Sequence, residues 1–104
     1  MIRQASIMQI KPGCEAEYQR RHDEIWPDMV KELKAHGAHH YSIFLEPASH
    51  QLFAYVEIDD EQLWSQMAET EVCQRWWAMM CDIMPSHEDN SPIETALKPV
   101  FYLD

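Results

Sequence analysis

The sequence predicts an α+β fold in which two helical regions pack on a four-stranded antiparallel sheet. Apolar residues alternate with polar ones in several short segments, recur at helical spacing in others, and Pro or Gly separates the segments. The chain of 104 residues and 12.3 kDa has the size of one domain, so we treat residues 1–104 as a single unit. Hydrophobic residues make up 46% of it, which is enough for one core.

The N-terminal part predicts a strand followed by helical structure. Residues 2–10 alternate in polarity, and a turn at residues 11–13 follows. From Cys14 to Gly37 the apolar residues recur at steps of three and four. Pro27 interrupts this pattern, so we expect a kink or a new helix with Pro27 in its first turn. Gly37 is a typical residue just beyond a helix end.

The central part predicts a β-hairpin followed by two helical segments. Residues 38–46 and 51–58 alternate in polarity and are separated by a loop of hairpin length. Asp59 and Asp60 are candidate N-caps for the first helical segment. Thr70 is a candidate N-cap for the second, which we expect to end before Pro85.

The last expected element is a short strand at residues 100–103, placed after Pro99. The element order is then β-α-β-β-α-β, which is the ferredoxin-like arrangement. Helices cover only one face of such a sheet. The other face, which carries Tyr41 or Tyr55, therefore needs a ligand or a second subunit to cover it.

Charge and cysteine content exclude several classes of function. The net charge of −10 disfavours nucleic acids and anionic membrane surfaces as partners. No apolar run is long enough to span a membrane, and the N-terminus does not resemble a signal peptide. Two glycines in the whole chain leave no phosphate-binding loop. Three cysteines without metal-binding spacing indicate reduced cytoplasmic thiols, and we expect no metal site.

Two pairs of residues are candidates for a ligand site. Tyr18 and His22 are four positions apart, so a helix places a phenol and an imidazole on one face, where they could hold a polyhydroxy ligand and move a proton. Trp76 and Trp77 point about 100° apart on a helix, so one indole can face a cleft and stack on a sugar ring. Each pair has a structural alternative. Tyr18 and His22 can be polar-tipped residues at the edge of the core, and both tryptophans can be core residues.

Several segments together resemble the L-rhamnose mutarotase family over the whole chain. The segments are EYQRRHDEIWPDM (17–29), HGAHHYSIFL (36–45), TEVCQRWWAMMCDIMP (70–85), DNSP (89–92) and the final FYLD. The combination of RRH-x-x-IWP with a Trp-Trp pair is the most specific part. Two positions depart from the pattern: His40 replaces an expected Asn, and Pro99 replaces an expected acidic residue.

The resemblance implies a dimeric α/β barrel that interconverts the α and β anomers of L-rhamnose in the cytoplasm. It implies a homodimer joined through the sheets, and no metal or organic cofactor. His22 falls on the proton donor of the family, and the sugar-binding positions fall on Tyr18, Tyr41, Trp76 and Trp77. The general base is left open.

Two other functions are compatible with the predicted fold. Dimeric α/β barrels also include monooxygenases and lactone isomerases, and a haem-dependent member would be coloured when purified. A non-catalytic, stress-type module that binds a small ligand is the third possibility, and it would not accelerate the exchange of sugar anomers.

Overall fold

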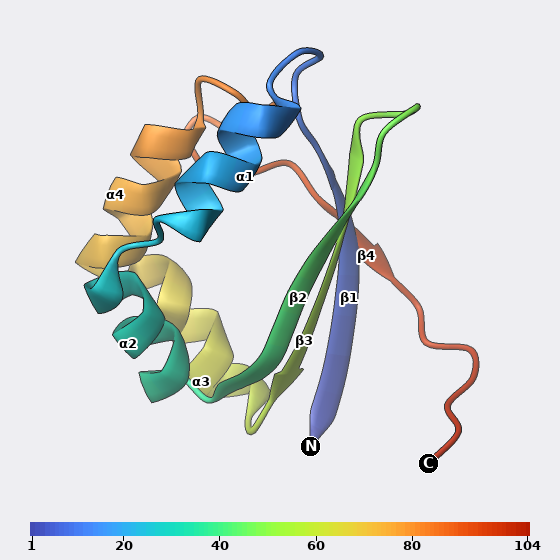
Figure 1. The fold of residues 1–104 in the computed structure, drawn as a ribbon. Coiled ribbons are helices and arrows are strands. Elements are labelled where there is room, and N and C mark those ends of the chain that lie inside the picture. The colour runs from blue at the N-terminus through green and yellow to red at the C-terminus, as the bar shows by residue number, and fades with distance from the viewer.

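Four antiparallel strands form a sheet in the order β2-β3-β1-β4 in the computed structural model, which describes residues 1–104. The strands are β1 (Ile2–Gln9), β2 (Ala38–Glu46), β3 (Gln51–Ile58) and β4 (Thr95–Leu97). The helices are α1 (Glu15–Asp23), α2 (Pro27–Ala35), α3 (Glu61–Ser65) and α4 (Glu71–Met80), and the 3₁₀ turn η1 (Gln66–Glu69) joins α3 to α4. All of them lie on one side of the sheet (Figure 1). This layout confirms the predicted ferredoxin-like arrangement.

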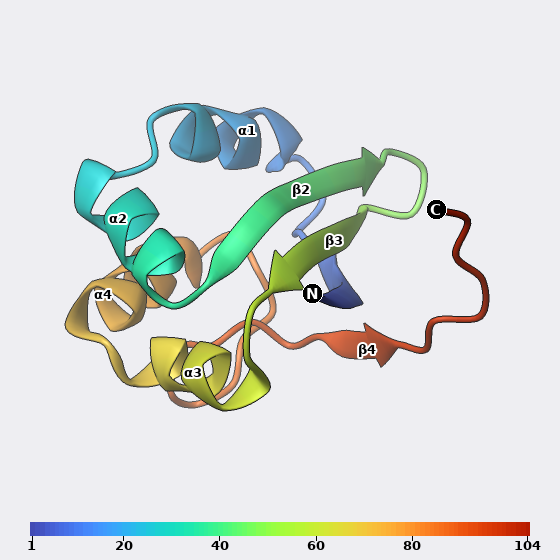
Figure 2. The same cartoon turned by 90° about the horizontal axis from the view of Figure 1, so that it is seen from below.

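Local sequence signals explain where the helices begin. Pro27 starts a new helix: Trp26 before it is extended, with φ −62° and ψ 134°, and Pro27 takes the first helical position. The Asp60 carboxylate accepts a hydrogen bond from the backbone N–H of Leu63 at 2.8 Å and caps α3. Thr70 caps α4 in the same way. Viewed from below, α1 and α2 lie toward the β2 side of the sheet and α3 toward the β4 side (Figure 2).

The predicted position of the last strand is wrong. The strand lies at Thr95–Leu97, before Pro99, where Ala5 of β1 pairs with Leu97 and Ile7 pairs with Thr95. In this register Pro99 would face a residue near the start of β1. Pro99 has no backbone N–H to donate to that residue. In the same register Val100 would face Ile2, the first residue of β1, and residues 101–103 would lie at or beyond Met1, so this apolar segment has almost no strand to pair with.

A β-bulge in β2 decides which face each of its side chains takes. His39 pairs with Glu57, but Ser42 pairs with Tyr55, so one extra residue lies between them, and His40 there has a φ of 49°. The bulge turns Tyr41 toward the helices, where its ring lies 6.3 Å from that of Trp64. The prediction that the uncovered face carries Tyr41 or Tyr55 therefore holds for Tyr55 alone.

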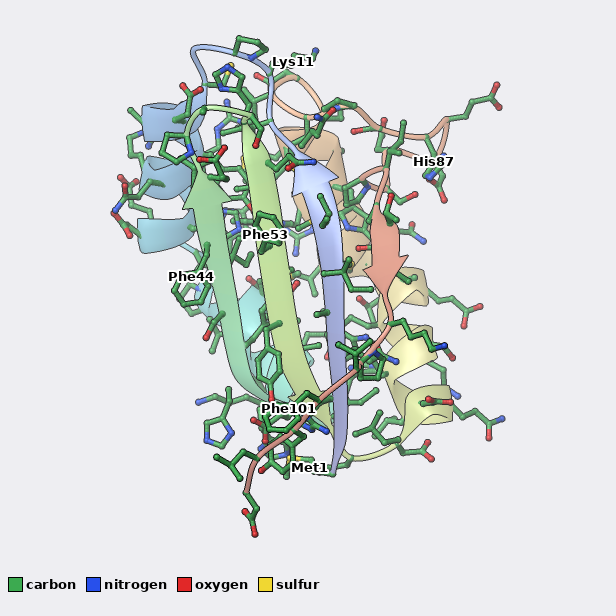
Figure 3. The ribbon with its side chains drawn as sticks, turned by 90° about the vertical axis from the view of Figure 1, so that its right-hand side faces the viewer. Met1, Lys11, Phe44, Phe53, His87 and Phe101 are labelled. Atoms are coloured by element: carbon green, nitrogen blue, oxygen red, sulfur yellow. The ribbon has the colours of Figure 1, made fainter.

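The two faces of the sheet differ in their burial. The core lies between the sheet and the helices, where Leu52 and Ile58 are almost fully buried. The opposite face is uncovered, with Phe44 68% exposed and Phe53 37% exposed (Figure 3). The chain after β4 runs out along the lower end of this face, and the apolar residues 100–103 are exposed there. None of the helices is long and apolar enough to cross a bilayer.

Candidate functional site

The Tyr18–His22 pair of α1 forms one wall of the site. Their rings stack with centroids 4.3 Å apart and an angle of 27° between their planes, as the four-residue spacing predicts. His22 Nδ1–H donates to the carbonyl oxygen of Tyr18 at 3.0 Å. This bond leaves Nε2 as the imidazole nitrogen that is available to a ligand.

One arginine, Arg21, holds α1 against the end of α4. Arg21 donates to the carbonyl oxygen of Met79 at 2.9 Å and pairs with Asp82 at 2.8 Å, both just beyond or at the end of α4. Arg21 also pairs with Glu17, one turn earlier on α1. Arg21 therefore docks α1 on α4, whereas Arg20 pairs only with Glu17 and Glu24 along its own helix. The imidazole of His22 points about 100° away from Arg21 around the helix, toward the cavity.

The surroundings of both residues favour their neutral forms. Burial lowers the pKa of His22 from its usual value near 6.5, and this effect outweighs the hydrogen bond to Tyr18, which acts in the opposite direction. Burial also raises the pKa of the Tyr18 phenol above its usual value of 10. The buried surroundings therefore favour the imidazole form of His22 over its imidazolium, and Tyr18 keeps a hydroxyl proton at neutral pH that it can donate.

The two tryptophans of α4 take different positions. Trp76 is a core residue with 7% exposure, and its ring lies edge-on to those of His22 at 5.3 Å and Trp26 at 5.2 Å. Trp77 is half-buried and packs against the core from the cavity side. Trp76 is therefore a core residue and Trp77 the more accessible one, because consecutive side chains on α4 point about 100° apart.

Tyr41 reaches the site from the sheet. It keeps 43% exposure because it faces an open cavity. Partial desolvation at the cavity wall and the nearby Glu94 carboxylate raise the pKa of Tyr41 to about 12. The phenol is therefore protonated at neutral pH and available as a hydrogen-bond donor.

All five predicted site residues line one cavity between the helices and the sheet. The cavity has a volume of about 1350 Å³ and opens to solvent, and most of the residues that line it are hydrophobic. Tyr18 and His22 come from α1, Tyr41 from β2, and the tryptophans from α4. An apolar cavity with a few converging polar groups is the usual form of a small-molecule site.

Further polar and aromatic residues line this cavity that the sequence does not predict as site residues. Three of them are Trp64, Asn90 and Glu94. Trp64 lies in the first turn and a half of α3, the helix capped by Asp60, but nothing in the sequence assigns it to a site. Glu94 accepts a hydrogen bond from the Ser6 hydroxyl at 3.2 Å, a contact between β1 and the approach to β4 that no local pattern in the sequence reveals.

The comparisons with known proteins agree on one family. The family model for L-rhamnose mutarotase matches residues 3–103. An L-rhamnose mutarotase from Mannheimia succiniciproducens is 58% identical over 104 residues, which is all of both chains. The crystal structure of an L-rhamnose mutarotase from Formosa agariphila superimposes with a TM-score of 0.92 at 35% identity and covers both chains completely.

A more distant structural match shows the fold alone. It is a dimeric ferredoxin-like protein from an uncultured marine organism, with a TM-score of 0.69 at 14% identity over 99% of each chain. The full-length matches at much higher identity define the family more narrowly. On this evidence the chain belongs to the L-rhamnose mutarotase family.

Proposed function

We propose that this protein interconverts the α and β anomers of L-rhamnose by opening and reclosing the pyranose ring. The observation that carries the proposal is the His22 imidazole in the cavity wall, held through Nδ1 with Nε2 unoccupied, in a chain of this family. Ring opening needs one proton delivered to the ring oxygen and one removed from the anomeric hydroxyl. A group that titrates near neutral pH can make such transfers in both directions.

His22 is the general acid in this proposal. Protonated His22 gives its Nε2 proton to the ring oxygen as the bond from that oxygen to C1 breaks, and the anomeric hydroxyl loses its proton to a base. The product is the open-chain aldehyde with a free hydroxyl at the former ring oxygen. Rotation about C1–C2 turns the other aldehyde face toward that hydroxyl, and closure reverses both transfers. The lowered pKa of His22 makes its imidazolium a stronger acid than a free one.

The remaining residues hold the sugar. Tyr18 and Tyr41 keep their hydroxyl protons at neutral pH and donate hydrogen bonds to sugar oxygens. An indole of Trp76 or Trp77 packs on the apolar face of the ring, which in rhamnose includes the C6 methyl group. The raised pKa of Tyr18 supports a role in orienting the substrate more than a role as a base.

The proposal includes a cytoplasmic homodimer that uses neither a metal ion nor an organic cofactor. The three cysteines are unpaired, as is usual in a reducing compartment. The uncovered sheet face offers adjacent aromatic side chains, with Phe44 opposite Phe53 in the strand register. A second copy covering this face would close two sheets into a dimeric barrel.

Saturation-transfer NMR of rhamnose anomer exchange tests the function directly. We expect His22→Ala to lower the catalysed exchange rate by at least about 10²-fold, the lower end for acid–base catalysis. His22→Gln should not restore the rate, because an amide donates a hydrogen bond but does not transfer its proton.

His36→Ala is the matched control. His36 also bonds through Nδ1 to the carbonyl oxygen four residues earlier, at 2.9 Å, but it does not line the cavity. It should exchange anomers at the wild-type rate. Normal exchange by a folded His22→Ala variant would contradict the assignment of the acid, and a wild-type protein without activity would contradict the function.

A further inference from the structure

The loop that follows α4 forms part of the cavity wall and is closed by its own hydrogen bonds. The backbone N–H of His87 donates to the carbonyl oxygen of Ser91 at 2.8 Å, and that of Asn90 donates to the carbonyl oxygen of His87 at 2.9 Å. An isolated β-bridge joins Ser86 to Pro92 at the base of the loop. The loop is therefore a small closed turn whose shape does not depend on a ligand.

A side-chain contact fixes the tip of this turn as well. The Asp89 carboxylate accepts hydrogen bonds from the backbone N–H of Ser91 at 3.0 Å and from its hydroxyl at 2.5 Å. The same bonds lower the pKa of Asp89, so the carboxylate is charged and bonded at neutral pH. Asp89 and Ser91 thus hold the residue between them, Asn90, in one backbone conformation.

Asn90 has two properties that a purely structural turn residue does not need together. Its backbone is left-handed, with a φ of 71°, a conformation that Gly adopts without strain and Asn tolerates. Its side chain is half-buried and lines the cavity, and the bonds that close the loop use only its backbone. The conformation explains why Gly or Asn is suitable here, but it does not explain a carboxamide at the cavity wall.

The loop lines the same cavity as Tyr41. Glu94 follows Asn90 closely in the chain, and its carboxylate is near enough to Tyr41 to raise the pKa of that phenol. Asn90, Glu94 and Tyr41 all line this one cavity. A carboxamide is well suited to a sugar hydroxyl, because it offers both a donor and an acceptor and stays neutral.

We propose that Asn90 is a sugar-binding residue, whose carboxamide hydrogen-bonds a hydroxyl group of the substrate from a turn already in its binding conformation. The inference deepens the proposed function and rests on it. Since the turn is closed by Asp89 and Ser91, little conformational freedom is lost on binding. The interaction is formed equally in the ground state and the transition state, because Asn90 takes no part in proton transfer. It should therefore affect KM and not kcat.

Asn90→Gly is the decisive variant, because Gly keeps the left-handed backbone and removes only the carboxamide. We expect KM for rhamnose in the anomer-exchange assay to rise about threefold to tenfold, as for the loss of one hydrogen bond, with kcat within about twofold of wild type. The midpoint of thermal unfolding should be unchanged or higher. Glu88→Gln is the control on the same loop: its side chain is exposed and outside the cavity, and KM should not change.

Asn90→Ala separates binding from loop shape. Ala removes the carboxamide and is strained at a positive φ, so a loop-shape role predicts a raised KM for Ala and a wild-type KM for Gly. A wild-type KM for Asn90→Gly overturns the inference and leaves the proposed function intact. If the wild-type protein does not exchange anomers, calorimetric titration with rhamnose still tests the inference, since Asn90→Gly should then bind the sugar more weakly than wild type.

Discussion

One hydrogen bond determines which nitrogen of His22 can take part in proton transfer. Since Nδ1–H donates to the Tyr18 carbonyl within the same helix, every proton that the imidazole gives or receives passes through Nε2. The stacked phenol of Tyr18 and the perpendicular indole of Trp76 both pack against the imidazole and restrict its rotation. The residue is therefore oriented before a substrate arrives, which reduces the entropy cost of a proton transfer.

The pH dependence of catalysis should show how His22 is used. If its protonated form is the acid, kcat/KM follows the protonated fraction, so it rises as pH falls and has its midpoint below about 6.5, because burial lowers the pKa. The measurement is anomer exchange by NMR from pH 5 to 8, after subtraction of the uncatalysed rate. His22→Ala should lose this limb. A kcat/KM that instead falls on acidification through the same midpoint would identify His22 as the base.

At the scale of single elements, α4 contributes both a core residue and a candidate binding surface. We expect Trp76→Ala to lower the free energy of unfolding by about 3–5 kcal/mol, because it removes a nearly fully buried indole. We expect Trp77→Ala to weaken rhamnose binding and to unfold close to the wild-type midpoint. Urea denaturation and calorimetric sugar titration measure the two effects. Trp77→Phe, which keeps an aromatic face, should bind between wild type and Trp77→Ala.

The contrary outcome for the tryptophans is equally specific. If both alanine variants lose stability to the same degree and both bind rhamnose normally, neither indole contacts the sugar. Both tryptophans would then be core residues, which is the structural alternative that the sequence leaves open.

Elements marked by local signals, including the strands of the hairpin, could be predicted from the sequence, whereas the details set by strand register could not. The new helix at Pro27 and the caps at Asp60 and Thr70 follow from residues within one turn. The last strand was misplaced because residues 100–103 have the stronger strand composition, whereas β1 offers partners only to Thr95–Leu97. The bulge in β2 is likewise a property of its register with β3.

The same distinction holds for the candidate site. The shared face of Tyr18 and His22 is a consequence of helical spacing, so the sequence predicts it. The lowered pKa of His22 is not predictable in this way, since it depends on burial beneath elements distant in the chain. The sequence does not predict Asn90 and Glu94 as site residues for the same reason. The polar segment around them has the composition of a surface loop, and only the fold places it at the cavity.

At the scale of the whole molecule, the uncovered face of the sheet is an exposed apolar surface that a partner could cover. Phe44 and Phe53 face solvent there as neighbours on adjacent strands, and Leu97 and the apolar residues 100–103 add to the exposed area. Exposed apolar surface of this extent is typical of an interface. A self-complementary dimer through this face buries it symmetrically and leaves the cavity, on the opposite side of the sheet, within each subunit.

Light scattering should therefore report two 12.3 kDa chains per particle at micromolar concentration. Phe44→Asp should shift the protein toward the monomer, because it would place a charge in the apolar interface without a partner. Ala78→Asp adds the same charge at an exposed position on α4, away from this face, and should remain dimeric. A wild-type monomer at this concentration would contradict the homodimer. A fully dimeric Phe44→Asp variant would place the subunit contact on another surface.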